Sequence, residues 1–382
     1  MLTASVLRPL WDRTAEWTCR LAMIEEARSF LYLSTFYVEH DHYGTTLLTA
    51  LLDAQRRGVS VNLLLDGFGA RLGGVLMTGD EKRALSSTLT SLRLAGATVT
   101  VYQPEYSLQR LGGGQHVKIQ VSEQGEAIFG SSNITKSSFD GWNEYSVALR
   151  GRVVRRLLES YRTIGGSVDD RHLESLDSVV TQRPGRISLD YWMCNPNALQ
   201  GRLGPFGWRG PNIVTDRMIA MIESAHTTIE LTSFFFKPVP SLMNAVLDAA
   251  RRGVRVAIYH SARQALPATD MAWIASAVGY RQLLNAGVEI YENIHGEHSK
   301  IVLIDRSRVA FGSYNFEDAA HDRLAEAMLA TADDEGVAPA VAIFEELCAD
   351  PDNTRVTSAG LQALPRRLKM KQALCGQFKR WM

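Results

Sequence analysis

The chain has 382 residues, of which 46% are hydrophobic and 21% charged, as is ordinary for a globular protein with room for two hydrophobic cores. Its 41 basic residues are balanced by 41 acidic ones, which argues against a nonspecific nuclease, although a local basic groove would not show in the sum. The four cysteines are scattered and predict neither a disulfide scaffold nor a zinc site. No window reaches the roughly 18–20 apolar residues of a membrane-spanning helix, so we expect a protein that is soluble or lies on a surface.

The two halves of the chain carry the same succession of predicted elements. In each half a helix leads into a buried strand, a second helix ends at Arg-Arg-Gly before another strand, and a third helix is followed by glycine and a strand. The repeated units are residues 23–37 and 221–235, 54–67 and 249–262, and 92–104 and 283–293. This alternation predicts βαβ units and a mixed or parallel sheet covered by helices in each half. Two unrelated α/β domains would need several ordered coincidences to give it.

The stretch between the halves has a different composition. Residues 176–212 hold four prolines and the clusters YWM and FGW, which predict an irregular connector whose aromatic residues either form a binding surface or pack between the lobes. The expected division is an N-terminal lobe at 1–175, the connector at 176–212, a C-terminal lobe at 213–350 and a tail at 351–382. Two glycine-rich stretches, 69–79 and 111–115, fit no nucleotide-binding fingerprint and are predicted to be mobile loops near the mouth of the site.

A set of polar residues recurs at the same spacing in both halves. A histidine and a lysine stand two apart in a predicted strand, so their side chains share one face. The lysine is followed 15 residues later by the asparagine of a Gly-Ser-x-Asn turn, and the histidine is followed 28 residues later by a glutamate. The two sets are His116, Lys118, Ser131, Asn133 and Glu144, and His298, Lys300, Ser313, Asn315 and Glu326.

These residue types suit chemistry at a phosphate. If the two sets meet across a pseudo-twofold axis, their lysines and asparagines can bind phosphate oxygens that gain charge in the transition state. Their serines are candidates for substrate contact. Two histidines can serve as one nucleophile and one general acid/base, and a carboxylate beside each imidazole would orient it.

The repeated pattern H-x-K-x4-D-x6-G-S-x-N is similar to that of the phospholipase D superfamily. The second copy matches it fully, including Asp305, and the first has Glu123 at the acidic position. The resemblance covers about residues 20–150 and 215–332. It implies an α/β fold of two tandem phospholipase-D-like lobes, each a mixed β-sheet flanked by helices, related by pseudo-twofold symmetry around one shared active site. It also implies a structural role for the motif acids.

Within this superfamily the layout looks most like bacterial cardiolipin synthases and related phosphatidyltransferases. The sequence departs from them at Val117, where an arginine is common, and lacks their usual N-terminal membrane helices, which leaves the substrate open. The resemblance implies a two-step displacement in which one histidine forms a phosphohistidine and the other protonates the leaving alcohol, then deprotonates water or an acceptor alcohol. Analogy with the family favours His116 as the nucleophile and His298 as the acid/base over the reverse assignment, and the sequence does not decide between them. No metal or cofactor is expected, because the lysines and asparagines supply charge and donors.

Other candidates lie near these motifs. His40 and His42, in the loop EHDHYG, are either solvated, ligands of a metal, or contacts to a substrate headgroup, and we keep them as candidate substrate-binding residues. His295 is expected in a polar turn, and Trp142 and Tyr314 are expected to pack around the site.

The tail at 364–382 carries six positive charges between Arg366 and Arg380 and no acid. Its apolar residues can form a rough helical stripe, namely Leu364, Leu368, Leu374, Phe378 and Trp381. Such a segment either lies on an anionic membrane or packs on the second lobe as an ordinary terminal helix.

The preferred hypothesis is a phosphatidyltransferase or phospholipase D that is cytoplasmic, peripheral at the inner membrane surface, and possibly cardiolipin-synthase-like. It binds a phospholipid substrate, contacts the membrane through residues 364–382 and requires no oligomer. A phosphodiesterase or nuclease of the same superfamily, acting on nucleic acid, is the alternative. A noncatalytic binding protein is disfavoured, because both halves retain every motif histidine, lysine and asparagine.

Overall fold

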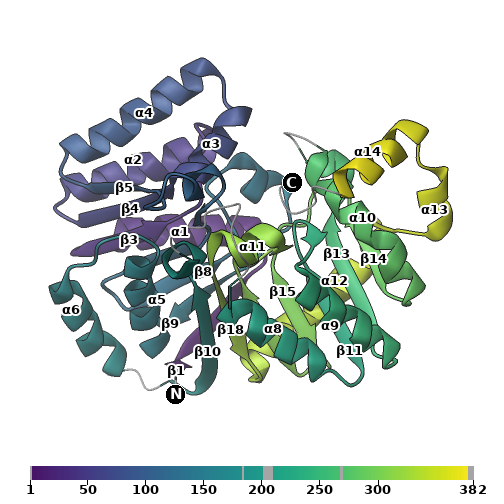
Figure 1. Ribbon diagram of the computed structural model, residues 1–382. Coiled ribbons are helices and arrows are strands. Elements are labelled where there is room, and N and C mark those ends of the chain that lie inside the picture. Colours follow the sequence, from purple (N-terminus) through teal and green to yellow (C-terminus); the bar gives the residue numbers. More distant parts are fainter. Residues whose placement is uncertain (1, 183–184, 201–209, 267–269, 377–382) are drawn as a thin grey trace.

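The computed structural model describes residues 2–182, 185–200, 210–266 and 270–376 and consists of two β-sheets with helices packed on them (Figure 1). Each half of the chain contributes the central part of one sheet, which bears out the duplicated α/β architecture expected from the repeats.

In the described residues the first sheet has the strand order β2-β9-β8-β7-β3-β4-β5. Strands β3, β4 and β5 are parallel, and the remaining pairs are antiparallel. The strands are β2 (Val6–Leu10), β3 (Phe30–Ser34), β4 (Ser60–Asp66), β5 (Thr98–Tyr102), β7 (Lys118–Ser122), β8 (Glu126–Gly130) and β9 (Ser146–Arg150). The sheet is therefore mixed, with the first motif lysine at the start of a central strand.

The second sheet repeats this plan, with the order β1-β10-β18-β16-β15-β11-β13-β14-β19 in the described residues and β6 paired to β18. Its parallel strands β11, β13 and β14 correspond to β3, β4 and β5. The strands are β1 (Leu2–Ala4), β6 (Gly114–Gln115), β10 (Ile187–Cys194), β11 (Thr228–Thr232), β13 (Arg255–Ser261), β14 (Glu289–Asn293), β15 (Ile301–Ile304), β16 (Arg308–Gly312), β18 (Leu324–Thr331) and β19 (Asn353–Arg355). A separate parallel pair joins β12 (Phe236–Lys237) to β17 (Phe316–Glu317).

The helices begin and end where local chemistry favours it. Asp41 caps α2 by accepting the Gly44 N–H, and the predicted glycine caps after Arg-Arg are confirmed by positive φ at Gly58 and Gly253. The helices of the first half are α1 (Arg13–Glu26), α2 (His42–Arg56), α3 (Gly67–Leu76), α4 (Gly79–Leu94), η1 (Gln109–Leu111), η2 (Ser137–Gly141), α5 (Arg152–Thr163) and α6 (Asp170–Thr181). Those of the second are α7 (Pro196–Gln200), α8 (Ile213–Glu223), α9 (Pro240–Arg251), η4 (Arg263–Ala265), α10 (Met271–Asn285), α11 (Asp318–Asp322), α12 (Asp334–Ala349), α13 (Ser358–Ala363) and α14 (Arg366–Gly376).

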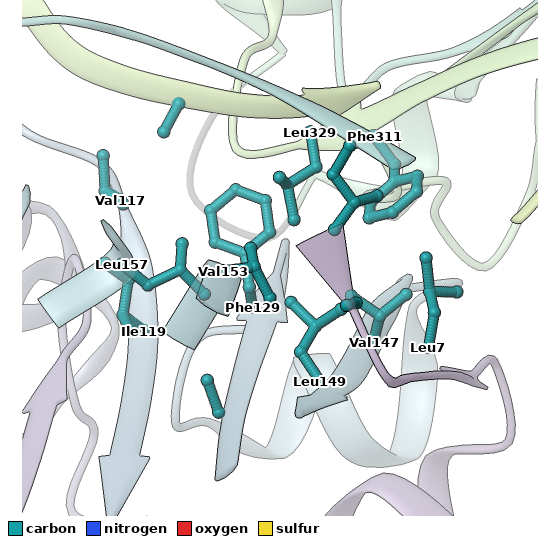
Figure 2. Close-up of a cluster of buried hydrophobic side chains, with 14 of the residues drawn as sticks. Leu7, Val117, Ile119, Phe129, Val147, Leu149, Val153, Leu157, Phe311 and Leu329 are labelled. Carbon is teal, nitrogen blue, oxygen red and sulfur yellow. The ribbon is translucent and has the colours of Figure 1, made fainter. Parts of the chain in front are cut away.

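A continuous hydrophobic core joins the two halves. It takes Phe129 and Val147 from the first sheet and Phe311 and Leu329 from the second, together with residues of α5, α6 and α12 (Figure 2). The rings of Tyr145 and Phe311 meet edge to face at 5.4 Å. Separate clusters lie under α1, α2 and α4 and under α8, α9 and α10. The shared core holds the motif strands of both halves in one frame.

Two sequence-based expectations about loops are wrong. The predicted irregular connector contains β10, whose side chains alternate between buried and less buried positions as in a half-exposed strand; its FGW cluster at 206–208 lies outside the described residues. The stretch 69–79 is mostly helix α3, because Gly69 and Gly73 face the buried side and allow close packing, and Asp66 caps its first turn. Within 111–115, residues Gly114–Gln115 form β6, which pairs with β18 of the other half.

The C-terminal tail forms α13 and α14 as far as it is described. Helix α14 packs against α10 and buries Leu368, whereas Met370 and Leu374 are exposed. Packing on the second lobe, one of the two interpretations, therefore holds for this helix, and residues 377–382 lie outside the described part. None of the helices in the described ranges is long and apolar enough to cross a bilayer.

Candidate active site

The two motif histidines enter the site from equivalent positions in the two halves. His116 follows β6 and precedes β7, and its backbone N–H donates to Ala325 O at 2.8 Å. His298 precedes β15, and its backbone N–H donates to Asn143 O at 2.8 Å. In both cases the acceptor belongs to the other half, so the interface between the halves fixes both histidines.

The side chains repeat this exchange. His116 Nδ1 lies 2.9 Å from Glu326 Oε1, and His298 Nδ1 lies 2.8 Å from Glu144 Oε1. A carboxylate does lie beside each imidazole, as the spacing predicted, but it comes from the opposite half. With Nδ1 held by the carboxylate, Nε2 is the ring nitrogen available for phosphorus or a proton. Each His–Glu contact therefore joins a histidine of one half to a glutamate of the other half.

The motif serines hold these glutamates. Ser131 Oγ donates to Glu144 Oε2 at 2.5 Å, and Ser313 Oγ donates to Glu326 Oε2. Ser138, which the sequence did not single out, donates to Glu144 Oε1 at 2.7 Å. All three serines are buried. The hydroxyl groups of Ser131 and Ser313 donate to the carboxylates that orient the histidines, and their contact with substrate stays a prediction.

Both motif lysines are buried beside their own histidines. Lys118 Nζ donates to His116 O at 2.7 Å, and Lys300 Nζ donates to His298 O. Burial lowers the pKa of Lys118 well below its ordinary value and lowers that of Lys300 to about 8, and nearby glutamates offset part of the effect. In their protonated state, the two lysines form a compact source of positive charge next to the imidazoles.

The asparagines are oriented through their side-chain oxygens. Asn133 Oδ1 accepts from Thr35 Oγ1 at 3.4 Å, and Asn315 Oδ1 accepts from the Phe234 N–H at 3.4 Å. In the second half Asn315 Nδ2 also donates to Glu317 Oε1 at 3.3 Å. Holding the oxygen in this way leaves each amide group positioned as a hydrogen-bond donor.

Aromatic rings cover the histidines. The ring of Phe36 meets that of His116 edge to face at 4.7 Å, and Trp142 stacks on His298 at 5.0 Å with Phe234 beside it at 4.6 Å. Trp142 thus packs against the site as predicted. These rings exclude water, which strengthens the electrostatic interactions among the motif residues.

The electrostatics favour neutral imidazoles. Burial lowers the pKa of His116 well below its ordinary value and that of His298 to about 4, and the lysine charges act in the same direction. Burial alone would raise the pKa of Glu144, but the charges of His298 and Lys300 outweigh it and bring the pKa to about 2. Burial raises the pKa of Glu326 to about 8. A neutral imidazole is the state that can attack phosphorus or accept a proton.

The motif acids lie in the turns between β15 and β16 and between β7 and β8, and they bind the backbone just before β11 and β3. Asp305 accepts the backbone N–H groups of His226, Thr227 and Thr228 at 2.7–2.9 Å, and Glu123 Oε1 accepts the Arg28 N–H at 2.7 Å. These contacts agree with the structural role implied by the resemblance.

His40 and His42 flank the start of α2. His42 is exposed in the first helical turn, and His40 is half-buried just before it. Asp41, which lies between them, caps the helix, so this residue of the EHDHYG sequence has a structural role that needs no bound ligand. Contact with a substrate headgroup stays a prediction. No group of three or more His, Cys, Asp or Glu side chains in the described part of the chain could hold a metal ion.

The segment just before each histidine is fixed by residues that the sequence motifs did not identify. Asp66 Oδ2 accepts the Gln115 N–H at 2.8 Å, and at the corresponding place Ser261 Oγ accepts the Glu297 N–H at 3.0 Å. Glu297 is buried, which raises its pKa to about 7. The signal was available: Asp66-Gly and Ser261-Ala align in the repeat, and Gln115 and Glu297 directly precede the histidines.

Comparisons with known proteins agree with this geometry. A family model described as "Cardiolipin synthase, PLD-like domain" matches residues 21–163 and 218–348. The cardiolipin synthase of Geobacillus kaustophilus (strain HTA426) is 26% identical over 312 residues, which cover 78% of this chain and 57% of that protein. Cardiolipin synthase B of Salmonella typhimurium (strain LT2) is 26% identical over 313 residues, covering 77% and 68%.

Among solved structures, phosphatidylserine synthase from Haemophilus influenzae Rd KW20 has the same fold. Its TM-score is 0.70 at 13% identity, with 98% of this chain and 93% of that chain covered. The chain therefore spans only 57% of the length of the Geobacillus relative, whereas it covers 93% of the phosphatidylserine synthase chain.

Proposed function

The chain belongs to the family of cardiolipin synthase PLD-like domains, and we propose that it is a phosphatidyltransferase that cleaves and re-forms a phospholipid phosphodiester through a phosphohistidine. The observation that carries the proposal is the pair of exchanged His–Glu contacts, at 2.9 Å and 2.8 Å, flanked by two buried lysines. This arrangement supplies two oriented imidazoles and fixed positive charge, which a two-step transfer at phosphorus requires.

In the first step His116 Nε2 attacks phosphorus and forms a P–N bond while the bond to the leaving alcohol oxygen breaks. His298 gives that oxygen a proton. Its pKa of about 4 in the free site rises when an anionic phosphodiester binds beside it, because added negative charge favours the imidazolium. Glu144, 2.8 Å away, stabilises the same protonated state.

In the second step the acceptor hydroxyl attacks phosphorus, His298 removes its proton, and the P–N bond to His116 breaks. Lys118 and Lys300 balance the charge on the phosphoryl oxygens in both steps, and Asn133 and Asn315 donate hydrogen bonds to them. Water in place of the alcohol gives phospholipase D activity at the same site.

The names of the relatives favour a lipid over a nucleic acid as substrate. Both curated relatives are cardiolipin synthases, and the balanced charge of 41 basic and 41 acidic residues gives no general attraction for nucleic acid. We infer that a phospholipid such as phosphatidylglycerol is the donor, that an alcohol is the acceptor, and that the four-part division at 1–175, 176–212, 213–350 and 351–382 describes the working units of the chain.

We also propose peripheral membrane contact through the tail. Helix α14 buries Leu368 against the second lobe and leaves Met370 and Leu374 exposed, with Lys369 and Lys371 on either side of Met370. Exposed apolar and basic side chains on one helix suit an anionic bilayer surface.

The experiment is to incubate the purified protein with phosphatidylglycerol vesicles, with phosphatidylethanolamine plus glycerol, and separately with single-stranded DNA. Mass spectrometry of the lipids is expected to show a transfer product and released alcohol, and His116→Ala and His298→Ala are each expected to abolish it. Cleavage of DNA without lipid turnover would refute the proposal in favour of a nuclease. Full activity in either histidine variant would refute the shared site.

A further inference from the structure

Helix α3 lies directly on the segment that covers His116. Gly69 and Gly73 occupy its inner face, where an added Cβ would fall 2.3 Å from Phe36 O and 2.6 Å from the Tyr37 ring. The Phe36 ring contacts the imidazole of His116 at 4.7 Å. Only the thickness of one helix, about 10 Å, therefore separates the outer face of α3 from the wall of the active site.

The outer face of α3 is apolar and uncovered. Leu72, Val75 and Leu76 are spaced as one helical stripe and are 45%, 66% and 38% exposed. The adjoining segment at η1 adds Leu108 and Leu111, which are 51% and 63% exposed. Arg71 joins the two elements, since its guanidinium donates to Arg110 O. Soluble surfaces rarely gather so many large apolar side chains without a binding function.

A groove next to this stripe combines an apolar floor with positive charge. It has a volume of about 570 Å³ between α3 and α4 and is lined by Arg71, Lys82 and Arg93 over Val75, Met77, Leu85 and Leu89. None of its lining residues, which all belong to the described chain, is acidic. The nearby acids at the start of α4 are engaged locally, Asp80 with Arg83 and Glu81 with Thr78.

We propose that α3, η1 and the α3–α4 groove form a docking surface of the first lobe for the anionic face of a lipid bilayer. Figure 1 shows α3 and α4 together on this lobe, away from α14. The apolar stripe enters the headgroup region, and the groove cations meet lipid phosphates. This inference rests on the proposed function, since it delivers lipid substrate beside His116, and it differs from the tail contact in lying on the opposite lobe. The charge of the groove favours a lipid bilayer over a protein as the ligand. A groove lined by cations and flanked by exposed leucines suits anionic amphiphiles better than it suits a neutral protein surface.

The test measures sedimentation with vesicles of phosphatidylglycerol and phosphatidylcholine in equal amounts, and with phosphatidylcholine alone. One variant combines Val75→Asp with Leu111→Asp, and a second combines Lys82→Glu with Arg93→Glu. The matched controls are Ile213→Asp, an exposed apolar residue at the start of α8, and Arg251→Glu, an exposed cation on α9. Circular dichroism melting verifies that each variant is folded.

Both α3–α4 variants are expected to bind mixed vesicles about ten-fold more weakly or worse, while the controls bind like the wild type. The charge-reversed variant is expected to lose the preference for phosphatidylglycerol vesicles. With monomeric short-chain phosphatidylglycerol, kcat/KM is expected to stay within about two-fold of the wild type, because no bilayer is involved.

Three results would overturn the inference: unchanged vesicle binding, equal losses in the control variants, or an equal loss of activity on the monomeric lipid. A wild-type dimer that Val75→Asp dissociates would assign the surface to self-association instead. Failure of the proposed function looks different, because the wild type would then bind vesicles through this surface and yet transfer no phosphatidyl group from either substrate.

Discussion

Replacing Glu144 with Gln probes the exchanged pairing most directly. The carboxylate lies 2.8 Å from His298 Nδ1 but belongs to the other half of the chain, so the substitution removes charge beside the proposed general acid without changing the motif that contains it. The comparison variant is Glu326→Gln, 2.9 Å from His116, the proposed nucleophile; because burial raises the pKa of Glu326 to about 8, the measurements are made above pH 8, where both glutamates are ionised. The pseudo-twofold relation thus provides the control within one chain.

The size of the effect follows from the distance. At 2.8 Å and an effective dielectric constant of about 20, a carboxylate stabilises an imidazolium by about 6 kcal/mol. If the Gln oxygen, still held by Ser131 and Ser138, recovers half of this, about 3 kcal/mol is lost, which lowers the pKa of His298 by about two units. Protonation of a poor leaving group is then expected to slow by about 10²–10³.

The assay compares two leaving groups in single-turnover, quenched-flow measurements of the first step. Phosphatidylglycerol releases an alkoxide that needs a proton, whereas bis(4-nitrophenyl) phosphate releases nitrophenolate, which does not. Glu144→Gln is expected to slow the lipid by about 10²–10³ and the nitrophenyl ester by less than about three-fold. Glu326→Gln is expected to slow both substrates by the same factor, because His116 is the attacking group in both reactions whichever group leaves.

The reasoning fails if Glu144→Gln slows both substrates equally. If Glu326→Gln instead gives the loss that depends on the leaving group, His116 is the acid and His298 the nucleophile.

Other predictions concern charge, stability and the tail. Because burial lowers the pKa of Lys300 to about 8, its positive charge is lost as pH rises through that value, so kcat/KM is expected to fall above about pH 8 in a pH–rate profile; a profile that stays flat to pH 10 would contradict this. Asp305→Ala removes the acceptor for three backbone N–H groups and is expected to lower the free energy of unfolding by about 1–3 kcal/mol in urea titration, more than Glu123→Ala, which removes one. Met370→Asp with Leu374→Asp is expected to weaken vesicle binding without lowering the melting temperature, since both side chains are exposed; unchanged binding would remove the tail from the membrane contact.

The repeated segments predicted the duplicated mixed sheets, and the repeated His–Glu spacing predicted a carboxylate beside each imidazole. Both patterns can be recognised within each half of the sequence. Spacing could not reveal that Glu144 serves His298, since the partner depends on how the core around Phe129 and Phe311 joins the halves. Helix α3 was misread because glycine is a poor helix former, yet here Gly69 and Gly73 provide the flat face that close packing requires.

The two halves share their motif residues but not the surroundings of the site. Position 39 corresponds to position 237 at the repeat spacing of 198 residues. Glu39 is half-buried, and burial raises its pKa to about 7, whereas Lys237 is buried with its Nζ 3.4 Å from Glu317. The same strand exit therefore carries an acid in one half and a cation in the other. The Lys237 cation is paired with Glu317, whereas burial alone dominates the raised pKa of Glu39, so the two exits differ in their electrostatic surroundings. This difference in surroundings is consistent with the different roles that we propose for His116 and His298.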